Sequence, residues 1–536
     1  MKTLIKLLSV ICVVFWTTSC SDFLDEDPKG QMATMFFFNA PSDLTAAANA
    51  LYNVVQGAQN GNHQTNTRCL AGDDMSTHPS SNKLPLRQHD QYYVTDVNAW
   101  TNYNWEETYR TVKVANFIIN NAGRTPAPEQ DIKYLIAQAH YWRAYAYFMI
   151  VRIWGETPVM LEEVIDYNAP LATVQEIYDI IVADLKIAEG CRVSYPTAPF
   201  AGKAVTQAGA KATLAYVYMS MAGWPLNKGQ EYYQLAAAKA LEVINGVENG
   251  TYNHALLDEY WKIHSIAYNY NNPEVIVGVY YNRSRNSNGS PATDLNQDLA
   301  CGAWNDTNGE IKFWKEFPDG PRKEATYVPK YLTTEGELLD WWELTNLPVC
   351  APSFMKSAES AVVGQEWSYL ETTPVTMSGE KTHQIVRLAE VYCWYAEAVG
   401  RSGQTNAKAI ELLNKVRNRA DGKESNIYPA GMSPNDLAEA AYNEHGWEIA
   451  GYYWGCIAAR YYDMFRMNRV KDHFEYRKQN PMIEVAPGVF RNERVPVPLP
   501  PTPTDPGDDG VWRDSRMYSV PSYLEAQLNP NLKRTN

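Results

Sequence analysis

The chain of 536 residues has 45% hydrophobic and 20% charged positions and a mean hydropathy of −0.41, which are the proportions of a globular protein with a large core. No apolar run is long enough to cross a bilayer as a helix, which excludes a polytopic membrane protein. A formal net charge of −14 repels phosphate backbones, so nucleic acid is not expected as a partner. The 36 tyrosines and 16 tryptophans favour a partly wet binding surface, because their flat rings carry polar groups.

The first twenty residues have the pattern of a secretory leader. Lys2 and Lys6 precede an apolar stretch from Leu7 to Trp16, and small residues then lead to Cys20. This pattern resembles a bacterial lipoprotein signal, in which the cysteine thiol is acylated and becomes the first residue. We therefore predict a signal peptide over residues 1–19 and lipidation of Cys20. The alternative is an ordinary secreted protein in which this cysteine has no such role.

Residues 20–38 are predicted to form a solvated tether, because four carboxylates lie in the stretch from Asp22 to Asp27. The rest of the chain, residues 39–536, is predicted to be one domain.

The body of the chain is predicted to be mainly helical and to repeat a helix–turn–helix plan in residues 39–250 and 385–480. Small and aromatic residues alternate at helical spacing, and a further helix is expected over Val174–Glu189. A block from Ala389 to Leu413 resembles a tetratricopeptide repeat, which favours an α-solenoid core. The predicted pairs are Trp105–Asn121 with Asp131–Ile153, Lys203–Ala222 with Tyr232–Ile244, and Ile385–Val399 with Asn406–Arg419.

Residues 253–384 have a different character and are predicted to form a loop-rich insertion with little β structure. Glu274–Tyr281 is β-branched and aromatic, as in a short strand, whereas Asn282–Gly309 is rich in Asn, Ser and Gly and is expected to be an exposed loop. The C-terminal segment 495–536 begins with closely spaced prolines that enforce extended backbone. Long irregular segments of this kind often carry function.

Sequence signatures of catalysis and metal binding are absent. The chain has no HExxH, GxSxG, phosphate-loop or EF-hand pattern, no CxxC pair, and no HxH or HxxxH spacing among its nine histidines. We therefore predict no metal site and no cofactor, and we expect the protein not to be an enzyme. A disulfide between Cys301 and Cys350 stays open, because sequence spacing alone does not decide it.

Characteristic sequence blocks follow one another in a fixed order along nearly the whole chain. They are Ser19–Asp25, Trp105–Asn116, Ala139–Val159, Arg387–Ala398, Leu413–Ala420, Trp447-Glu448 with Arg460–Arg466, Val495–Pro498 and Asn529–Leu532. This series resembles the SusD-like (RagB/SusD) outer-membrane lipoproteins of Bacteroidetes. Its order and completeness, rather than any single block, carry the resemblance.

The resemblance implies four tetratricopeptide-like helix pairs and a loop-rich ligand-binding region. It implies a lipid-anchored protein on the cell surface that works as a lid over a TonB-dependent transporter of the SusC type. Such proteins capture oligosaccharides or polysaccharides without cleaving them. The alternatives are a receptor for peptides or glycopeptides on the same scaffold and, from a different class, a secreted α-helical glycoside hydrolase.

Binding a sugar without cleaving it requires exposed aromatic rings beside polar side chains, because sugars present apolar faces flanked by hydroxyl groups. Two zones outside the repeats meet this requirement, residues 71–100 and 280–314. Trp304 is the best placed, since it lies in a polar loop, whereas Trp314 and Tyr281 also fit positions in the core. The predicted stacking platforms are Trp100, Tyr281, Trp304 and Trp314, and the predicted hydrogen-bonding residues are Asp73, Arg283 and Asn305.

Overall fold

The structure is a computed structural model that describes residues 37–59, 67–78, 83–164, 166–195, 203–270, 272–281, 306–332, 336–344, 350–357, 381–452, 455–492 and 507–533. The predicted signal peptide and Cys20 lie outside these residues. Within the described part of the chain, none of the helices combines the length and the apolar character needed to span a bilayer.

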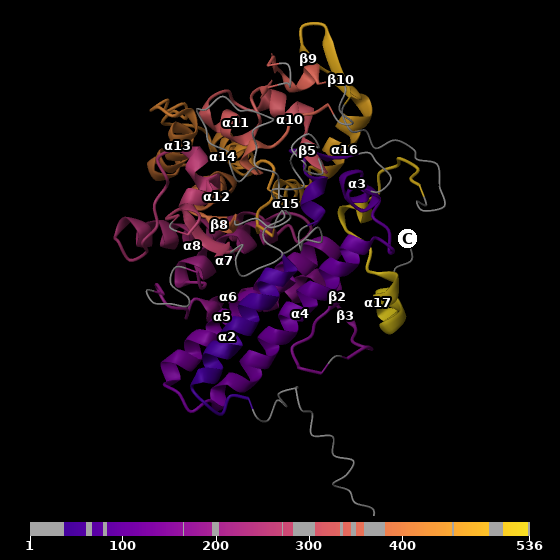
Figure 1. Ribbon diagram of the computed structural model, residues 1–536. Coiled ribbons are helices and arrows are strands. Elements are labelled where there is room, and N and C mark those ends of the chain that lie inside the picture. Colours follow the sequence, from indigo (N-terminus) through magenta and orange to yellow (C-terminus); the bar gives the residue numbers. More distant parts are fainter. Residues whose placement is uncertain are drawn as a thin grey trace, which may run out of the picture.

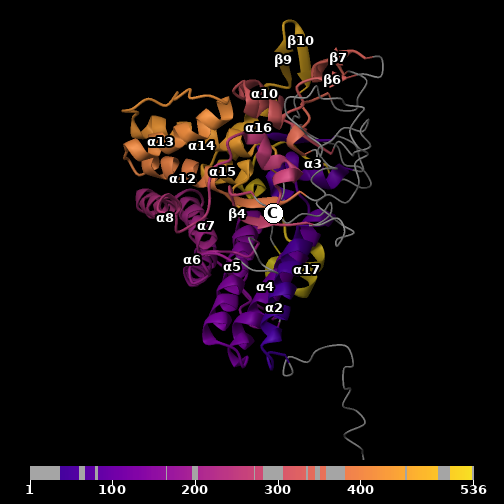
Figure 2. The same cartoon turned by 60° about the vertical axis from the view of Figure 1, so that its left-hand side comes forward.

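The fold is mainly helical, as predicted, and its longer helices stack one after another in a curved layer (Figures 1 and 2). The three predicted helix pairs are present as α4 with α5, α7 with α8, and α12 with α13. The helices of this layer are α2 (Ser42–Ala58), α4 (Ala99–Asn121), α5 (Glu129–Trp154), α6 (Val174–Ala188), α7 (Gln207–Ala222), α8 (Gln230–Glu248), α12 (Leu388–Arg401), α13 (Ala407–Asp421) and α14 (Pro434–Ile449).

Local sequence signals explain where several of these helices begin and end. The side chain of Asn98 accepts hydrogen bonds from the backbone of Trp100 and Thr101 at the start of α4. Thr173 and Glu176 form a reciprocal capping box at the start of α6. Helix α13 ends at Gly422, whose φ of 65° lies in the left-handed region that favours glycine.

The remaining described elements are short, and their strands form five antiparallel two-stranded ribbons. The strands are β1 (Met75–Thr77), β2 (Thr157–Pro158), β3 (Leu171–Ala172), β4 (Val275–Val279), β5 (Thr307–Gly309), β6 (Tyr331–Leu332), β7 (Leu338–Leu339), β8 (His383–Arg387), β9 (Met482–Ala486) and β10 (Val489–Asn492). The short helices are α3 (Leu84–Asp90), α10 (Ile311–Glu316), α11 (Pro321–Thr326), α15 (Arg460–Arg466), α16 (Val470–Gln479) and α17 (Tyr523–Leu528), together with 3₁₀ turns such as Trp341–Glu343.

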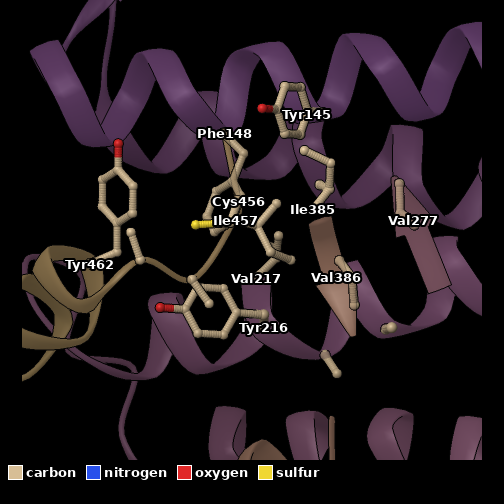
Figure 3. Close-up of a cluster of buried hydrophobic side chains, with 14 of the residues drawn as sticks. Tyr145, Phe148, Tyr216, Val217, Val277, Ile385, Val386, Cys456, Ile457 and Tyr462 are labelled. Carbon is tan, nitrogen blue, oxygen red and sulfur yellow. The ribbon is translucent and has the colours of Figure 1, made fainter. Parts of the chain in front are cut away.

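Strand β8 corrects one predicted boundary. The sequence placed Ile385 at the start of a helix, but His383–Arg387 pairs with β4, and α12 begins only at Leu388. Long-range pairing therefore overrides the helical pattern over these residues. The buried ribbon lies where α5 and α7 meet, and Figure 3 shows Ile385 and Val386 facing Tyr145, Phe148, Tyr216 and Val217.

The hydrophobic core also reaches further toward the N-terminus than predicted. Phe37 and Phe38 were assigned to the tether, but both are buried, with ring centroids 5.7 and 5.4 Å from that of Phe117. The folded body therefore already includes these two residues.

A network of six buried charges joins the helical layer to the loop-rich region. We call it the Glu448 network, and its members are Glu274, Arg322, Arg387, Arg419, Glu444 and Glu448. Nη1 of Arg387 lies 2.8 Å from carboxylate oxygens of both Glu274 and Glu448. Arg419 bridges the same two carboxylates at 2.9 and 2.6 Å. Strand β4 and helices α12, α13 and α14 are thus tied at one point.

Arg322 extends this network to α11. Its Nη1 lies 2.6 Å from Glu444 and 3.0 Å from Glu448. Burial favours the protonated acid, but the three guanidinium groups outweigh it and hold the pKa of Glu448 well below its usual range. Three arginines and three glutamates leave the network formally neutral, which makes its burial tolerable.

Replacing Glu448 by alanine should lower the free energy of unfolding by about 3 to 5 kcal/mol, because three guanidinium groups would stay buried with one counter-charge fewer. Urea unfolding followed by circular dichroism measures this change. The matched control is Glu439→Ala, which removes a partly exposed partner of Arg469 and Arg401 and should cost less than about 1 kcal/mol. Equal effects of the two substitutions would contradict the role given to the network.

Candidate functional site

The two zones predicted from the sequence come together in one β-ribbon. Strand β1 of the first zone pairs antiparallel with β5 of the second, in the register Met75↔Gly309, Ser76↔Asn308 and Thr77↔Thr307. The pairing continues at both ends, since His78 N donates to Asp306 O and Glu310 N donates to Asp74 O. Residues 307–309 are therefore a buried strand, and the predicted exposed loop through Gly309 is wrong for its last three residues.

One face of this ribbon is held by a buried ion pair. The hydroxyl and backbone N–H of Thr77 donate to Asp90 at the end of α3, at 2.9 and 3.0 Å. Arg477 of α16 lies 2.8 Å from Asp90 Oδ1 and pairs with Glu310, which directly follows β5. These buried contacts hold the strand pair in one position.

The opposite face of the ribbon is a row of polar side chains, because successive residues of a strand point to opposite sides. We call this the polar row, and it consists of Ser76, His78, Asp306 and Asn308. All four are at most 6% exposed. Ser76 Oγ and both amide atoms of Asn308 have no hydrogen-bond partner among the described residues. Buried polar atoms without partners are costly, so water is expected at this face, and a ligand would reach these atoms only after the residues that cover them move.

Two aspartates at this site hold their protons unusually strongly. Burial raises the pKa of Asp306 to about 6, although Lys83 Nζ lies 2.6 Å from its Oδ1. Burial and the neighbouring charge of Asp73 raise the pKa of Asp74 to about 7. Asp74 Oδ2 accepts a hydrogen bond from Gly451 N at 2.7 Å, and Oδ1 has no described partner.

Asp73, which the sequence proposed for hydrogen bonding to ligand, is engaged in an ion pair. Its two carboxylate oxygens lie 2.6 and 3.0 Å from Nε and Nη2 of Arg460. Although burial opposes ionisation, Arg460 lowers the pKa of Asp73. This contact ties the start of the ribbon to α15, and a role in ligand binding stays a prediction.

The predicted aromatic platforms differ in their surroundings. Tyr281 is 0% exposed, and its hydroxyl donates to Gln59 O at 3.1 Å. The prediction of a stacking platform at Tyr281 is therefore wrong, because no face of its ring is accessible. Trp100, in the first turn of α4, is half-buried against the main core and stays a prediction. Trp304, Arg283 and Asn305 lie outside the described residues, and only Trp304 and Asn305 directly precede Asp306 in the chain.

Trp314 belongs to a cluster of three tryptophans beside the ribbon. Its ring centroid lies 5.3 Å from that of Trp341 and 5.5 Å from that of Trp342. Trp314 and Trp342 are half-buried, whereas Trp341 is 2% exposed. Lys323 Nζ lies 4.7 Å from the Trp314 ring centroid.

Trp342 was not among the predicted platforms, because the neighbouring Leu338, Leu339 and Leu344 favour a packed helix in the sequence. The residues form a 3₁₀ turn in which Trp341 faces the small core and Trp342 is partly exposed. Adjacent residues of a helical turn point in different directions, so the pair Trp341-Trp342 itself indicated that one of the two rings would be more exposed. Arg491 of β10 donates to Trp342 O, which fixes the turn. The free thiol of Cys350 donates to Trp341 O at 3.2 Å, while Cys301 lies outside the described residues.

Comparison with known families agrees with this architecture. The model of a family described as "Starch-binding associating with outer membrane" matches residues 22–219, and the model described as "SusD family" matches residues 356–507. The chain belongs to the SusD (SusD/RagB) family.

Sequence similarity to individual relatives extends over most of the chain. SusD-like protein P2 of Formosa agariphila is 24% identical over 96% of this chain and 99% of its own length. A SusD-like protein of Bacteroides ovatus is 26% identical over 84% of this chain and 81% of its own.

Solved structures of the same fold include a SusD superfamily protein from Parabacteroides distasonis, with a TM-score of 0.67 and 19% identity over 94% of this chain and 98% of that one. Two others have TM-scores of 0.67 and 19% identity over 92% of this chain and 98% of theirs. One is described as crystallised with a xylogluco-oligosaccharide and the other as a laminarin-binding SusD-like protein.

The raised pKa of Asp74 predicts a measurable pH dependence of stability. Because the folded protein favours the protonated acid, the associated stability is complete below pH about 4 and is lost as the pH rises to about 7. Relative to Asp74→Asn, the natural protein should lose about 2 to 4 kcal/mol of unfolding free energy over that range. Urea unfolding from pH 4 to 8 measures the difference, and parallel profiles for the two proteins would refute the prediction.

Proposed function

We propose that the protein is a glycan-binding lipoprotein of the outer membrane that captures oligosaccharides or polysaccharides at the β1–β5 ribbon. The observation that carries this proposal is the polar row, with its unpartnered atoms next to the segment of Trp304 and Asn305. Two structural relatives, one crystallised with a xylogluco-oligosaccharide and one described as laminarin-binding, support the same ligand class.

The chemistry of the polar row suits sugar hydroxyl groups. A hydroxyl both donates and accepts hydrogen bonds, and Asn308 and Ser76 each offer a donor and an acceptor. Aromatic stacking would come from Trp304, with Trp314 and Trp342 as further platforms at the neighbouring cluster. Sugar rings would cover these aromatic faces while their hydroxyl groups meet the polar row.

The protein is proposed to bind its ligand without cleaving it. Among the described residues, no group of three or more His, Cys, Asp or Glu side chains is arranged to hold a metal ion. Asp73 is paired with Arg460, so it does not stand ready to activate water. Lipidation of Cys20 would hold the protein at the cell surface, where a SusC-like TonB-dependent transporter would receive the captured glycan.

Trp304→Ala should weaken glycan binding by at least about 2 kcal/mol, or about thirtyfold in Kd, because a stacking platform is lost. Isothermal titration calorimetry against plant, host and microbial glycans measures the affinity. Trp261→Ala is the control, since this partly buried ring packs on a separate small cluster with Tyr260 and Ile263.

The outcomes of this experiment separate the possible functions. Unchanged affinity of Trp304→Ala for a bound glycan would move the platform elsewhere. Binding of peptides or glycopeptides instead of glycans would favour the receptor alternative, and release of new reducing ends would establish a glycoside hydrolase.

Asn308→Ala should raise the Kd for the same glycan about tenfold, because the ligand loses a hydrogen-bonding partner in a buried position. Gln404→Ala removes an exposed amide far along the chain in the turn after α12 and should change nothing. A thermal unfolding scan checks that both variants fold. An Asn308→Ala variant that binds as tightly as the natural protein would place the ligand away from the ribbon.

A further inference from the structure

A second candidate binding surface is a groove lined by α4, by α17 and by residues of the segments 158–164 and 166–167. Helix α17 lies beside α4 (Figure 1). Its volume is about 390 Å³, within the range of small-ligand and peptide sites. No residue of the β1–β5 ribbon lines it. The side chains along its α4 wall are Trp105, Glu106, Tyr109, Arg110, Val112, Lys113 and Asn116.

The groove is preformed, because hydrogen bonds fix its walls at both ends. Tyr523 N donates to Asp96 O at 2.9 Å, and the side-chain amide of Asn529 donates to Ala169 O at 3.0 Å. On the other side, the Tyr109 hydroxyl donates to Pro158 O at 2.7 Å. Helix α17 is thus anchored at its two ends and leaves the space between it and α4 open.

Exposed apolar side chains lie on the segments that line the groove, and two of them, Tyr167 and Leu528, line it directly. Val164 is 82% exposed, Leu524 65%, Leu528 53%, Tyr167 50% and Leu161 39%. Apolar side chains gathered on one face of a soluble protein mark an interaction surface. They favour a protein partner, because apolar side chains of a partner would be removed from water by packing against them.

Two of the aromatic residues that line the groove, Trp105 and Tyr109, make contacts within the protein. Trp105 is 5% exposed, and the hydroxyl of Tyr109 is already bonded to Pro158. An aliphatic or aromatic side chain of a partner could pack against their edges and against the ring of Tyr167, which lines the groove and is 50% exposed.

The charges of the groove indicate the complementary chemistry. Five carboxylates, those of Glu106, Glu162, Glu163, Asp166 and Glu525, line it against the two cations Arg110 and Lys113, which leaves a net charge of −3. Burial raises the pKa of Glu525, and the charge of Glu106 raises it further. A cation placed between these carboxylates would relieve their repulsion.

The length of the groove fits an extended chain. From Trp105 to Asn116, α4 advances about 16 Å, which equals four or five residues of extended backbone. We propose that the groove binds an extended segment of a partner protein that carries an aliphatic or aromatic anchor flanked by Lys or Arg. This site is independent of the glycan site proposed at the ribbon.

The test is selection from a phage-displayed library of random heptapeptides on the immobilised full-length protein, followed by fluorescence polarisation with the selected peptides. We expect selected sequences to combine Lys or Arg with large apolar residues. Leu528→Arg should weaken their binding at least tenfold by placing a cation and bulk in the groove, and Glu106→Lys should weaken it through charge. Phe490→Arg is the matched control, because this 48%-exposed ring lies on β10, outside the groove, and its replacement should have no effect.

Three results would overturn the proposal. One is a selection without enrichment, and another is enrichment of peptides that bind Leu528→Arg as tightly as the natural protein. The third is binding of glucosamine oligosaccharides that Leu528→Arg abolishes, which would assign the groove to a cationic sugar. Glycan binding at the ribbon should be the same in all three variants, so failure of one proposal is distinguishable from failure of the other.

Discussion

The burial of six charges around Glu448 is the constraint on which the rest of the structure depends. Each carboxylate and guanidinium group in that network would be costly alone in a dry interior, and only their mutual contacts make burial possible. Because the arginines come from α11, from the junction of β8 with α12, and from α13, the network can form only when the loop-rich region is seated on the helical layer. It therefore couples the folding of two parts that lie far apart in the chain.

Buried ion pairs also hold the segments beneath the candidate glycan site. Arg477 links Asp90 and Glu310 on one side of the β1–β5 ribbon, and Arg460 holds Asp73 at its start. With these ion pairs behind it, a ribbon of only three paired residues has a fixed position. Polar side chains on its other face can then stay unpartnered, because the strands cannot shift to satisfy them.

We have proposed two binding surfaces for two kinds of ligand, the β1–β5 ribbon and the α4–α17 groove. The ribbon combines unpartnered donors and acceptors with nearby tryptophans, which suits neutral, hydroxyl-rich ligands. The groove combines exposed aliphatic side chains with an excess of carboxylates, which suits a basic polypeptide segment.

The sequence by itself determined the helical layer, since the period of its apolar residues and its capping residues are local properties. Helices α4, α5, α7 and α8 could be placed within a few residues, and the ordered blocks identified the family. Only the tertiary structure decided that Ile385 lies in a strand, that Tyr281 is buried and that Trp342 is partly exposed. It also decided that β1 pairs with β5 across more than 200 residues of chain. Pairing of distant segments and the side of a ring that faces water depend on contacts that no local pattern records, which is why the sequence could name two zones but not the way their residues are arranged.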